Sequence, residues 1–173
     1  MQTPLLARLA ARDRDLYIRW ALDDSSARML RDVLVAITHA GGALSSIVLA
    51  SLPLLGFEPL AAAGAKPLIA LIASHLIVQA FKRTVGRPRP SRTLSARAVI
   101  GEPDRFSFPS GHAAAAMSIA VVYAVLFPAV SVPVVVGATL VGLTRVFLGV
   151  HYPGDVIAGQ LIAVATALLV LAR

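Results

Sequence analysis

Five long apolar runs, separated by short polar segments, constrain what this chain can fold into. Each run approaches the roughly 20 mostly apolar residues that a helix needs to cross the hydrocarbon core of a bilayer. The runs cover residues 33–56, 60–81, 112–129, 131–150 and 154–172. Only 14% of the 173 residues are charged, whereas a soluble domain has about a quarter. The pattern predicts an all-α fold, an integral membrane helical bundle of about five transmembrane helices.

The N-terminal segment, residues 1–28, has a different pattern. Within residues 2–22, four arginines alternate with leucines and with Ile18 and Trp20. This is typical of an amphipathic helix lying in the membrane interface, and equally of a solvated helix packed on the bundle. We expect an interfacial N-terminal helix in residues 1–28, a transmembrane core in residues 29–173, and one domain over residues 1–173.

The net charge of +7 comes from 16 Lys and Arg against 9 Asp and Glu. These charges lie between the apolar runs, which favours a membrane surface and an anionic substrate as partners over nucleic acid. The chain has no cysteine, so it can form neither a disulfide nor a thiolate metal site.

Three polar patches carry nearly all the side chains able to do chemistry. They are residues 82–90, 109–112 and 144–155. The first ends the second apolar run, the second opens the third run, and the last lies between the fourth and fifth. Because successive spans cross the membrane in opposite directions, all three patches are predicted to lie on the same face.

The patches combine cations with a helix start. The cations are Lys82, Arg87, Arg89 and Arg145. Arginine can grip two oxyanion oxygens at once, whereas lysine acts as a point charge. Ser110 and Gly111 precede a helix, so backbone N–H groups there would point at an anion. Flanking charge that orients a membrane protein would account for the arginines in general, but not for the Pro-Ser-Gly-His sequence. We therefore expect a phosphate site.

Two of the four histidines lie in these patches. Asp155 follows His151 by four residues, so its carboxylate can reach the imidazole and fix its tautomer. His112 is then the natural general acid. For His39 and His75 we favour an ordinary place in the bundle, although His75 shares a helix face with Lys82.

A metal centre is the competing interpretation of the site. Hard cations need several carboxylates, and zinc sites need His, Cys or Glu in close groups. Near the patches the only acidic residues are Glu102, Asp104 and Asp155. We therefore expect a reaction without a metal or any other cofactor.

Together these motifs resemble the type 2 phosphatidic acid phosphatase family, which also includes vanadium haloperoxidases. The family pattern begins with Lys, six residues and Arg-Pro, which Lys82 and Arg89-Pro90 match. Its second part is Pro-Ser-Gly-His, matched at 109–112. Its third part is Ser-Arg, five residues, His, three residues and Asp; Arg145, His151 and Asp155 match it, with Thr144 in place of Ser.

The resemblance implies a mechanism and a role for each residue. His151 would attack phosphorus to form a phosphohistidine, with Asp155 orienting the ring. His112 would protonate the leaving group, and a water would complete the hydrolysis. The resemblance assigns phosphate binding to Lys82, Arg89, Ser110, Gly111 and Arg145. Family members commonly have six spans, and the interfacial helix would stand in for the sixth.

The expected activity is hydrolysis of a lipid phosphate or diphosphate. Candidate substrates are polyprenyl diphosphate, phosphatidic acid and phosphatidylglycerol phosphate, with lipid A or a polyprenyl-phosphoryl sugar phosphate as alternatives. A haloperoxidase fits less well because that branch is typically soluble and much larger. A transporter or scaffold with a polar path would not need a His-Asp pair beside an anion site.

The expected location is the inner membrane of a bacterial cell. In the predicted topology, all Lys and Arg except Lys66 and Arg173 lie on the side of the polar patches, which favours a cytoplasmic site. Relatives in the family commonly face outward, and we follow them. The 91–108 loop, with Arg92, Arg97 and Arg105, has two interpretations: it reads the lipid head group, or it is a solvated lid.

Overall fold

The computed structural model describes residues 4–22, 26–94, 98–102 and 104–173. Helices dominate, and the described part has no β-strand, only an isolated bridge between Pro88 and Phe106. The α-helices are α1 (Pro4–Trp20), α2 (Arg28–His39), α3 (Ala43–Ser51), α4 (Lys66–Val85), α5 (Pro90–Thr93), α6 (Gly111–Leu126), α7 (Ser131–Phe147) and α8 (Pro153–Leu171). Short 3-10 turns are η1 (Leu52–Leu55), η2 (Leu60–Ala63) and η3 (Pro128–Val130).

Three helical segments are long and apolar enough to cross a membrane. They are Lys66–Val85, Pro128–Phe147 and Pro153–Leu171. A fourth span is formed if Arg28–His39 and Ala43–Leu55, which meet at a 47° bend, are taken together. Helix α6, with 16 residues, is a shorter apolar helix. The all-α membrane bundle is thus confirmed, and each of the five apolar runs contains one of these elements.

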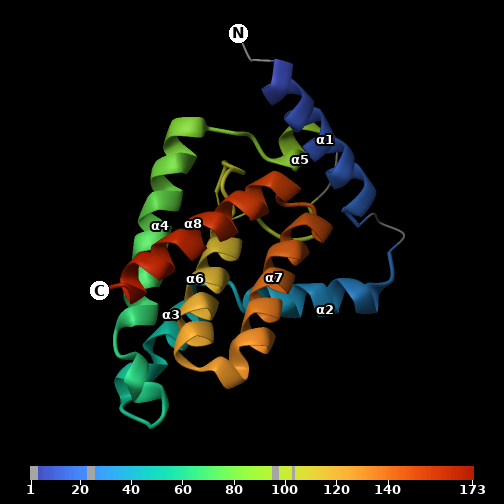
Figure 1. The fold of residues 1–173 in the computed structure, drawn as a ribbon. Helices are drawn as coiled ribbons and strands as arrows, with labels where there is room; N and C mark the ends of the chain where they lie inside the picture. Colours follow the sequence, from blue (N-terminus) through green and yellow to red (C-terminus); the bar gives the residue numbers. More distant parts are fainter. Residues whose placement is uncertain (1–3, 23–25, 95–97, 103) are drawn as a thin grey trace.

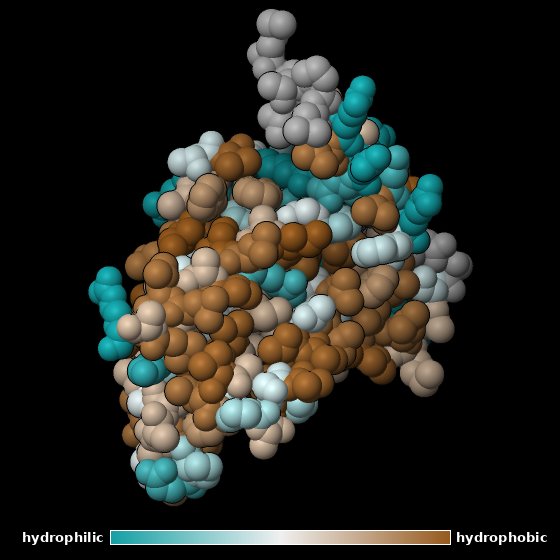
Figure 2. Space-filling model, in the orientation of Figure 1, coloured by the Kyte–Doolittle hydropathy of each residue, from teal (hydrophilic) through white to brown (hydrophobic). Residues whose placement is uncertain are grey.

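Much of the apolar surface faces outward. In the three long segments only 28–33% of the most apolar window is buried within the protein. Figure 2 shows the result as broad hydrophobic areas over the helices, with most hydrophilic side chains at the top of the view and smaller groups at the left edge and the lower tip. Such a surface is stable in lipid rather than in water, because large exposed apolar patches are costly in solution.

The break between α2 and α3 has a steric reason. A Cβ atom on Gly41 would lie 2.5 Å from Cγ1 of Val141 and 2.9 Å from the backbone oxygen of His112. Only glycine lets the chain pass this close to the start of α6. The bend therefore brings the end of α2 against the same end of the bundle as the Pro-Ser-Gly-His sequence.

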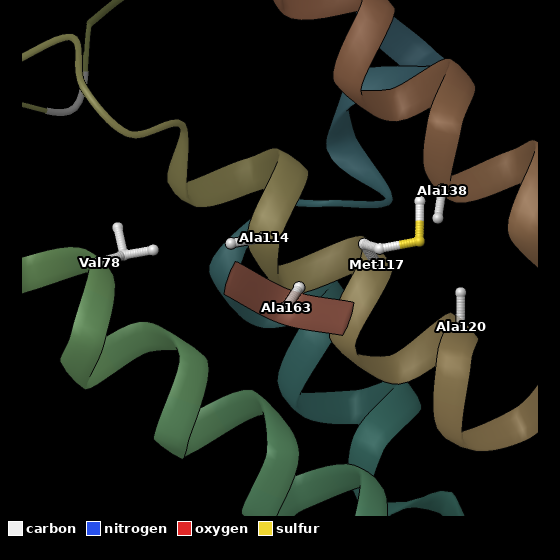
Figure 3. Packing of buried hydrophobic residues seen from close by; sticks show 6 residues of the cluster. All are labelled: Val78, Ala114, Met117, Ala120, Ala138 and Ala163. Carbon is white, nitrogen blue, oxygen red and sulfur yellow. The ribbon is translucent and has the colours of Figure 1, made fainter. Parts of the chain in front are cut away.

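Helix α6 is the centre of the bundle and packs against α4, α7 and α8 (Figure 1). Alanines make up most of the packed cluster at this centre, as Figure 3 shows. Its buried members are Val78, Ala114, Met117, Ala120, Ala138 and Ala163. Small side chains let membrane helices approach closely and gain dispersion contacts, so α6 holds the starts and ends of its neighbours in fixed positions.

Helix α1 lies across the end of the bundle where α8 begins (Figure 1). Tyr17 is its buried anchor, and the tyrosine hydroxyl donates to the backbone oxygen of Gly149 at 3.2 Å. Leu9, Ile18 and Trp20 are exposed. The helix expected in residues 1–28 is found, with residues 1–3 and 23–25 outside the described part. Its interfacial position stays a prediction.

Candidate active site

The three polar patches meet at the end of the bundle below α1 (Figure 1). Each patch is carried by the end of a helix: α4 ends within the first, α6 begins in the second, and α7 ends and α8 begins within the third. The fully or almost fully buried polar residues here are Lys82, Arg89, Ser107, Ser110, Arg145, His151 and Asp155. Gly111 and His112 are half-buried. The structure thus brings together all eight residues that the sequence analysis assigned to the site.

The start of α8 fixes His151 relative to Asp155. Asp155 is the third residue of this helix, and its Oδ2 atom accepts the N–H of Tyr152 at 2.9 Å as part of a capping box. The Nδ1 atom of His151, just before the helix, lies 3.6 Å from Oδ2. Ser107 donates its hydroxyl to the same oxygen and lies 3.4 Å from Nδ1. Nδ1 therefore faces the carboxylate, and Nε2 is left for another partner.

Burial controls the charge of His151. The imidazole is only 1% exposed, and this burial lowers its pKa from 6.5 to about 4, despite the opposing effect of Asp155. The ring is therefore neutral near pH 7. Neutral imidazole has a free lone pair and can act as a nucleophile.

Arg89 holds the other side of the imidazole. Its Nη1 atom lies 3.2 Å from His151 Nε2 and donates to the Val150 oxygen at 2.8 Å. Its Nε atom donates to the backbone oxygen of Asp104 at 2.6 Å. The guanidinium is thus fixed beside Nε2, where positive charge would stabilise an oxyanion on an attacked phosphorus atom.

A carboxylate from the loop before α6 contacts two of the predicted phosphate-binding cations. Asp104 accepts Lys82 Nζ at 3.0 and 3.2 Å and Arg89 Nη2 at 3.0 Å. Burial raises the pKa of Asp104, but its hydrogen bond to Lys82 and the two positive charges outweigh this and lower it. Lys82 and Arg89 thus converge on one anionic group in this structure.

Ser110 and Arg145 have buried polar atoms with no partner. Within the described residues, neither Ser110 Oγ nor Arg145 Nε has a hydrogen bond, whereas buried polar groups normally have one. Arg145 Nη1 donates to Thr38 Oγ1 at 2.9 Å. Free donors beside the start of α6, where backbone N–H groups are unpaired within the helix, suit an anionic ligand.

A cavity of about 530 Å³ opens next to Arg145 and His112. Its lining residues are Thr38, His39, Ile100, Gly101, Glu102, His112 and Arg145. His39, which we assigned to an ordinary place in the bundle, does bond its own helix through the Val35 oxygen, but also lines this cavity. His75 is exposed on α4, where its Nε2 atom lies 3.4 Å from Nε2 of Gln79.

The sequence analysis missed Ser107, Asp104 and Thr38 as parts of the site. No spacing rule marks them, because each reaches its partner across a long stretch of chain, such as the 48 residues between Ser107 and Asp155. Arg87 was counted among the cations of the patches but was given no role; in the structure its Nη1 atom donates to Asp155 Oδ1 at 2.7 Å. Among the described residues, no three His, Asp or Glu side chains form a group suited to a metal ion. Arg97 lies outside the described part.

Comparisons with known proteins identify the family of this chain. Residues 63–173 match the family model of the PAP2 superfamily. The lipid A 1-phosphatase of Rhizobium johnstonii is 37% identical over 101 residues, covering 56% of this chain and 41% of the relative. The chain therefore spans less than half the length of that protein. Phosphatidylglycerophosphatase B of Bacillus subtilis is 32% identical over 148 residues, covering 75% of the chain and 68% of the relative.

The solved structure of Aquifex aeolicus LpxE shares the fold. It superimposes with a TM-score of 0.77 at 24% identity, and covers 92% of this chain and 94% of that one. The family model includes all three polar patches, and the apolar spans make the chain an integral membrane protein. On both counts the resemblance seen in the sequence is confirmed: this chain belongs to the PAP2 superfamily.

Proposed function

We propose that the chain is a membrane phosphatase that removes phosphate from a lipid phosphate or diphosphate without a metal ion. The observation that carries this proposal is the buried His151, with Nδ1 facing Asp155 and Ser107 and with Nε2 beside Arg89. A nucleophile, an orienting carboxylate and a fixed cation are the groups that covalent phosphoryl transfer requires. The relatives are named as phosphatases of lipid A and of phosphatidylglycerophosphate.

The proposed reaction has two steps. His151 Nε2 attacks phosphorus and the bond from phosphorus to the lipid oxygen breaks. His112, whose protonated form is favoured by the negative charge of a bound phosphate, gives its proton to that oxygen. A water then attacks the phosphohistidine, His112 takes the water proton, and the nitrogen–phosphorus bond breaks to release phosphate. Asp155 stabilises the positive charge that the ring of His151 gains in the first step.

The phosphate oxygens need several donors during this reaction. We assign them to Lys82, Arg89, Ser110, Gly111 and Arg145, of which Ser110 and Arg145 have atoms free to bind. Lys82 and Arg89 bind Asp104 in this structure. A bound phosphate would therefore either displace Asp104 from these two cations or bind them together with Asp104. Metal-independent hydrolysis follows from this donor set, because the cations neutralise the transferring group.

The substrate class follows from where the site lies. The cavity beside Arg145 opens at the end of a bundle whose sides are apolar, so a phosphate on a membrane lipid reaches it directly. The main candidate substrates are polyprenyl diphosphate, phosphatidic acid and phosphatidylglycerol phosphate. The alternatives are lipid A and polyprenyl-phosphoryl sugar phosphates. Assays of these lipids side by side in detergent identify the preferred one.

Two variants test the proposed function. His151→Ala abolishes phosphate release from every lipid in the panel, whereas His75→Ala, which changes an exposed histidine of α4, leaves it unchanged. Brief incubation of the wild type with a lipid carrying labelled phosphate gives an acid-labile label on the protein. Activity in His151→Ala, or an acid-stable label, contradicts the mechanism.

We also propose that residues 1–173 form one domain of the bacterial inner membrane, with residues 1–28 in the interface, residues 29–173 as the transmembrane core and the site facing outward. The site, the α1 helix and the cavity all lie at one end of the bundle. A cysteine introduced at Ser95, which lies outside the described residues, is labelled by an impermeant reagent in intact cells if this orientation is right. Labelling only after lysis shows the opposite orientation.

A further inference from the structure

Arg87 lies between two carboxylates that are far apart in the chain. Its Nη1 atom is 2.8 Å from Oδ2 of Asp13 in α1 and 2.7 Å from Oδ1 of Asp155 in α8. The Asp155 side chain is fully buried and that of Asp13 is 14% exposed. One guanidinium therefore links the N-terminal helix to the carboxylate that faces His151.

Asp13 is also built into the first turn of α8. Its Oδ1 atom accepts the N–H of Gly154 at 2.7 Å, a donor that has no partner within the helix because of its position in the first turn. A Cβ on Gly154 would lie 2.9 Å from Asp13 Oδ2, so the carboxylate occupies the space that a larger residue would take. Asp13 thus contacts the backbone of the residue directly before Asp155.

A second set of contacts holds α1 and Arg87 against the same turn. The guanidinium carbon of Arg87 lies 4.0 Å from the centre of the Tyr152 ring. The Tyr152 ring also packs against Tyr17 of α1, with 5.4 Å between ring centres. Tyr17 anchors the helix through its hydrogen bond to the backbone oxygen of Gly149. Helix α1 is thus held by a charged contact, between Asp13 and Arg87, and by the uncharged contact of Tyr17.

The two carboxylate oxygens of Asp155 have different partners. Oδ2 accepts from Ser107 and Tyr152 and faces His151, while Oδ1 accepts from Arg87. If Arg87 had no second carboxylate, its whole charge would act on Asp155 and oppose the positive charge that develops on His151. Asp13 shares that charge and holds the guanidinium in place.

We infer that Asp13 is a positioning residue that makes α1 part of the catalytic unit by acting through Arg87 on Asp155. The inference rests on the proposed function, because it concerns the step in which His151 attacks phosphorus. Asp13 does not reach the cavity that would hold the phosphate. Its removal should therefore slow the chemical step and leave substrate binding intact.

The test is a pair of isosteric variants of one helix. Asp13→Asn keeps an oxygen for the Gly154 N–H but removes the charge beside Arg87. Outer partners of metal-bound histidines contribute about 10-fold or more. By analogy we expect kcat to fall about 10-fold while KM for the preferred lipid phosphate stays the same. Asp15→Asn removes the same charge from an exposed position of α1 and leaves both constants unchanged.

A double-mutant cycle separates positioning from helix docking. In an Arg87→Gln background, Asp13→Asn causes no further loss of kcat, because the link is already cut. Trp20, the only tryptophan of the chain, packs on Phe147 at 6.3 Å between ring centres, so its fluorescence reports whether α1 stays docked. The emission of Asp13→Asn equals that of the wild type.

Three results overturn the inference. They are wild-type kcat in Asp13→Asn, independent and additive losses in the cycle, and a loss of kcat accompanied by a shift in Trp20 emission that Tyr17→Phe reproduces. The last result would mean that α1 only has to be docked. If the wild type itself releases no phosphate from any lipid, the proposed function fails before the role of Asp13 is reached, and the two failures are therefore distinguishable.

Discussion

Ser107 donates its hydroxyl to the Oδ2 atom of Asp155, the oxygen that faces the imidazole of His151. Both side chains are fully buried. A buried carboxylate is stable only when its oxygens are hydrogen-bonded, and this serine completes the set formed by the Tyr152 N–H and Arg87. The loop before α6 therefore contributes to the orientation of His151.

Ser107→Ala should lower kcat about 10-fold, by analogy with residues that orient metal-bound histidines. It should also lower the free energy of unfolding by about 1–3 kcal/mol, because a buried acceptor loses a donor. Phosphate release and thermal unfolding in detergent measure the two effects. Ser118→Ala is the control, since this buried serine donates only to Ala115 of its own helix; equal losses in both variants would refute a specific role for Ser107.

Arg89→Lys keeps the charge but removes the fork that contacts Asp104, Val150 and His151 at once. Removing one donor to a developing oxyanion commonly costs about 100-fold in kcat, and we expect a loss of that order. Arg83→Lys, on the exposed side of α4, should behave as the wild type. A fully active Arg89→Lys would show that charge alone suffices at this position.

Gly159→Ala should displace the Pro-Ser-Gly-His segment. A Cβ there would lie 2.5 Å from the backbone oxygen of Ser110, closer than real contacts allow, so the start of α6 must shift. We expect a rise in the inhibition constant of vanadate, a phosphate analogue, together with a lower unfolding temperature. Gly137→Ala in α7 meets no atom within 4 Å and should be neutral, or stabilising by up to about 1 kcal/mol.

Acid should destabilise the folded protein through His151. Burial lowers its pKa from 6.5 in an exposed histidine to about 4 in the folded chain, so between these values protons bind the unfolded chain preferentially. The stability that comes from this group is complete above about pH 6.5 and is lost as the pH falls towards about 4. His151→Gln should therefore show a smaller drop in unfolding temperature between about pH 7 and about pH 5.

The matched variant for this titration is His75→Gln, which alters an exposed histidine and should keep the wild-type pH dependence. Identical pH dependence in the wild type and in His151→Gln would mean that the imidazole is not held neutral by burial.

The sequence was sufficient to predict the residues at span ends. Lys82, Arg145 and Asp155 lie in or next to the terminal turns of apolar helices, and the alternation of span direction places such ends on one face. The helix limits predicted from the sequence were less accurate than the predicted site residues. The run expected at 60–81 forms α4 at Lys66–Val85, because Pro67 favours the first turn and Gly86, with φ of 61°, ends the helix.

Contacts made by loops and by α1 could not be predicted in this way. Asp104, Ser107 and Asp13 reach the site only after the chain between the helices has folded back, and no periodicity encodes that path. The break in the 33–56 run was missed as well, because hydropathy does not register the close approach of Gly41 to Val141 and His112. Such positions depend on tertiary packing, which overrides local pattern.

The shortness of α6 has a consequence for the membrane around it. Its 16 residues measure about 24 Å at 1.5 Å per residue, whereas the hydrocarbon core is about 30 Å thick. Since longer helices surround α6, its start lies inside the protein, and we expect a lipid head group to leave the level of the other head groups to reach Ser110. The depth of the lipid in reconstituted vesicles is thus a variable of the reaction, and we expect turnover to change with acyl chain length.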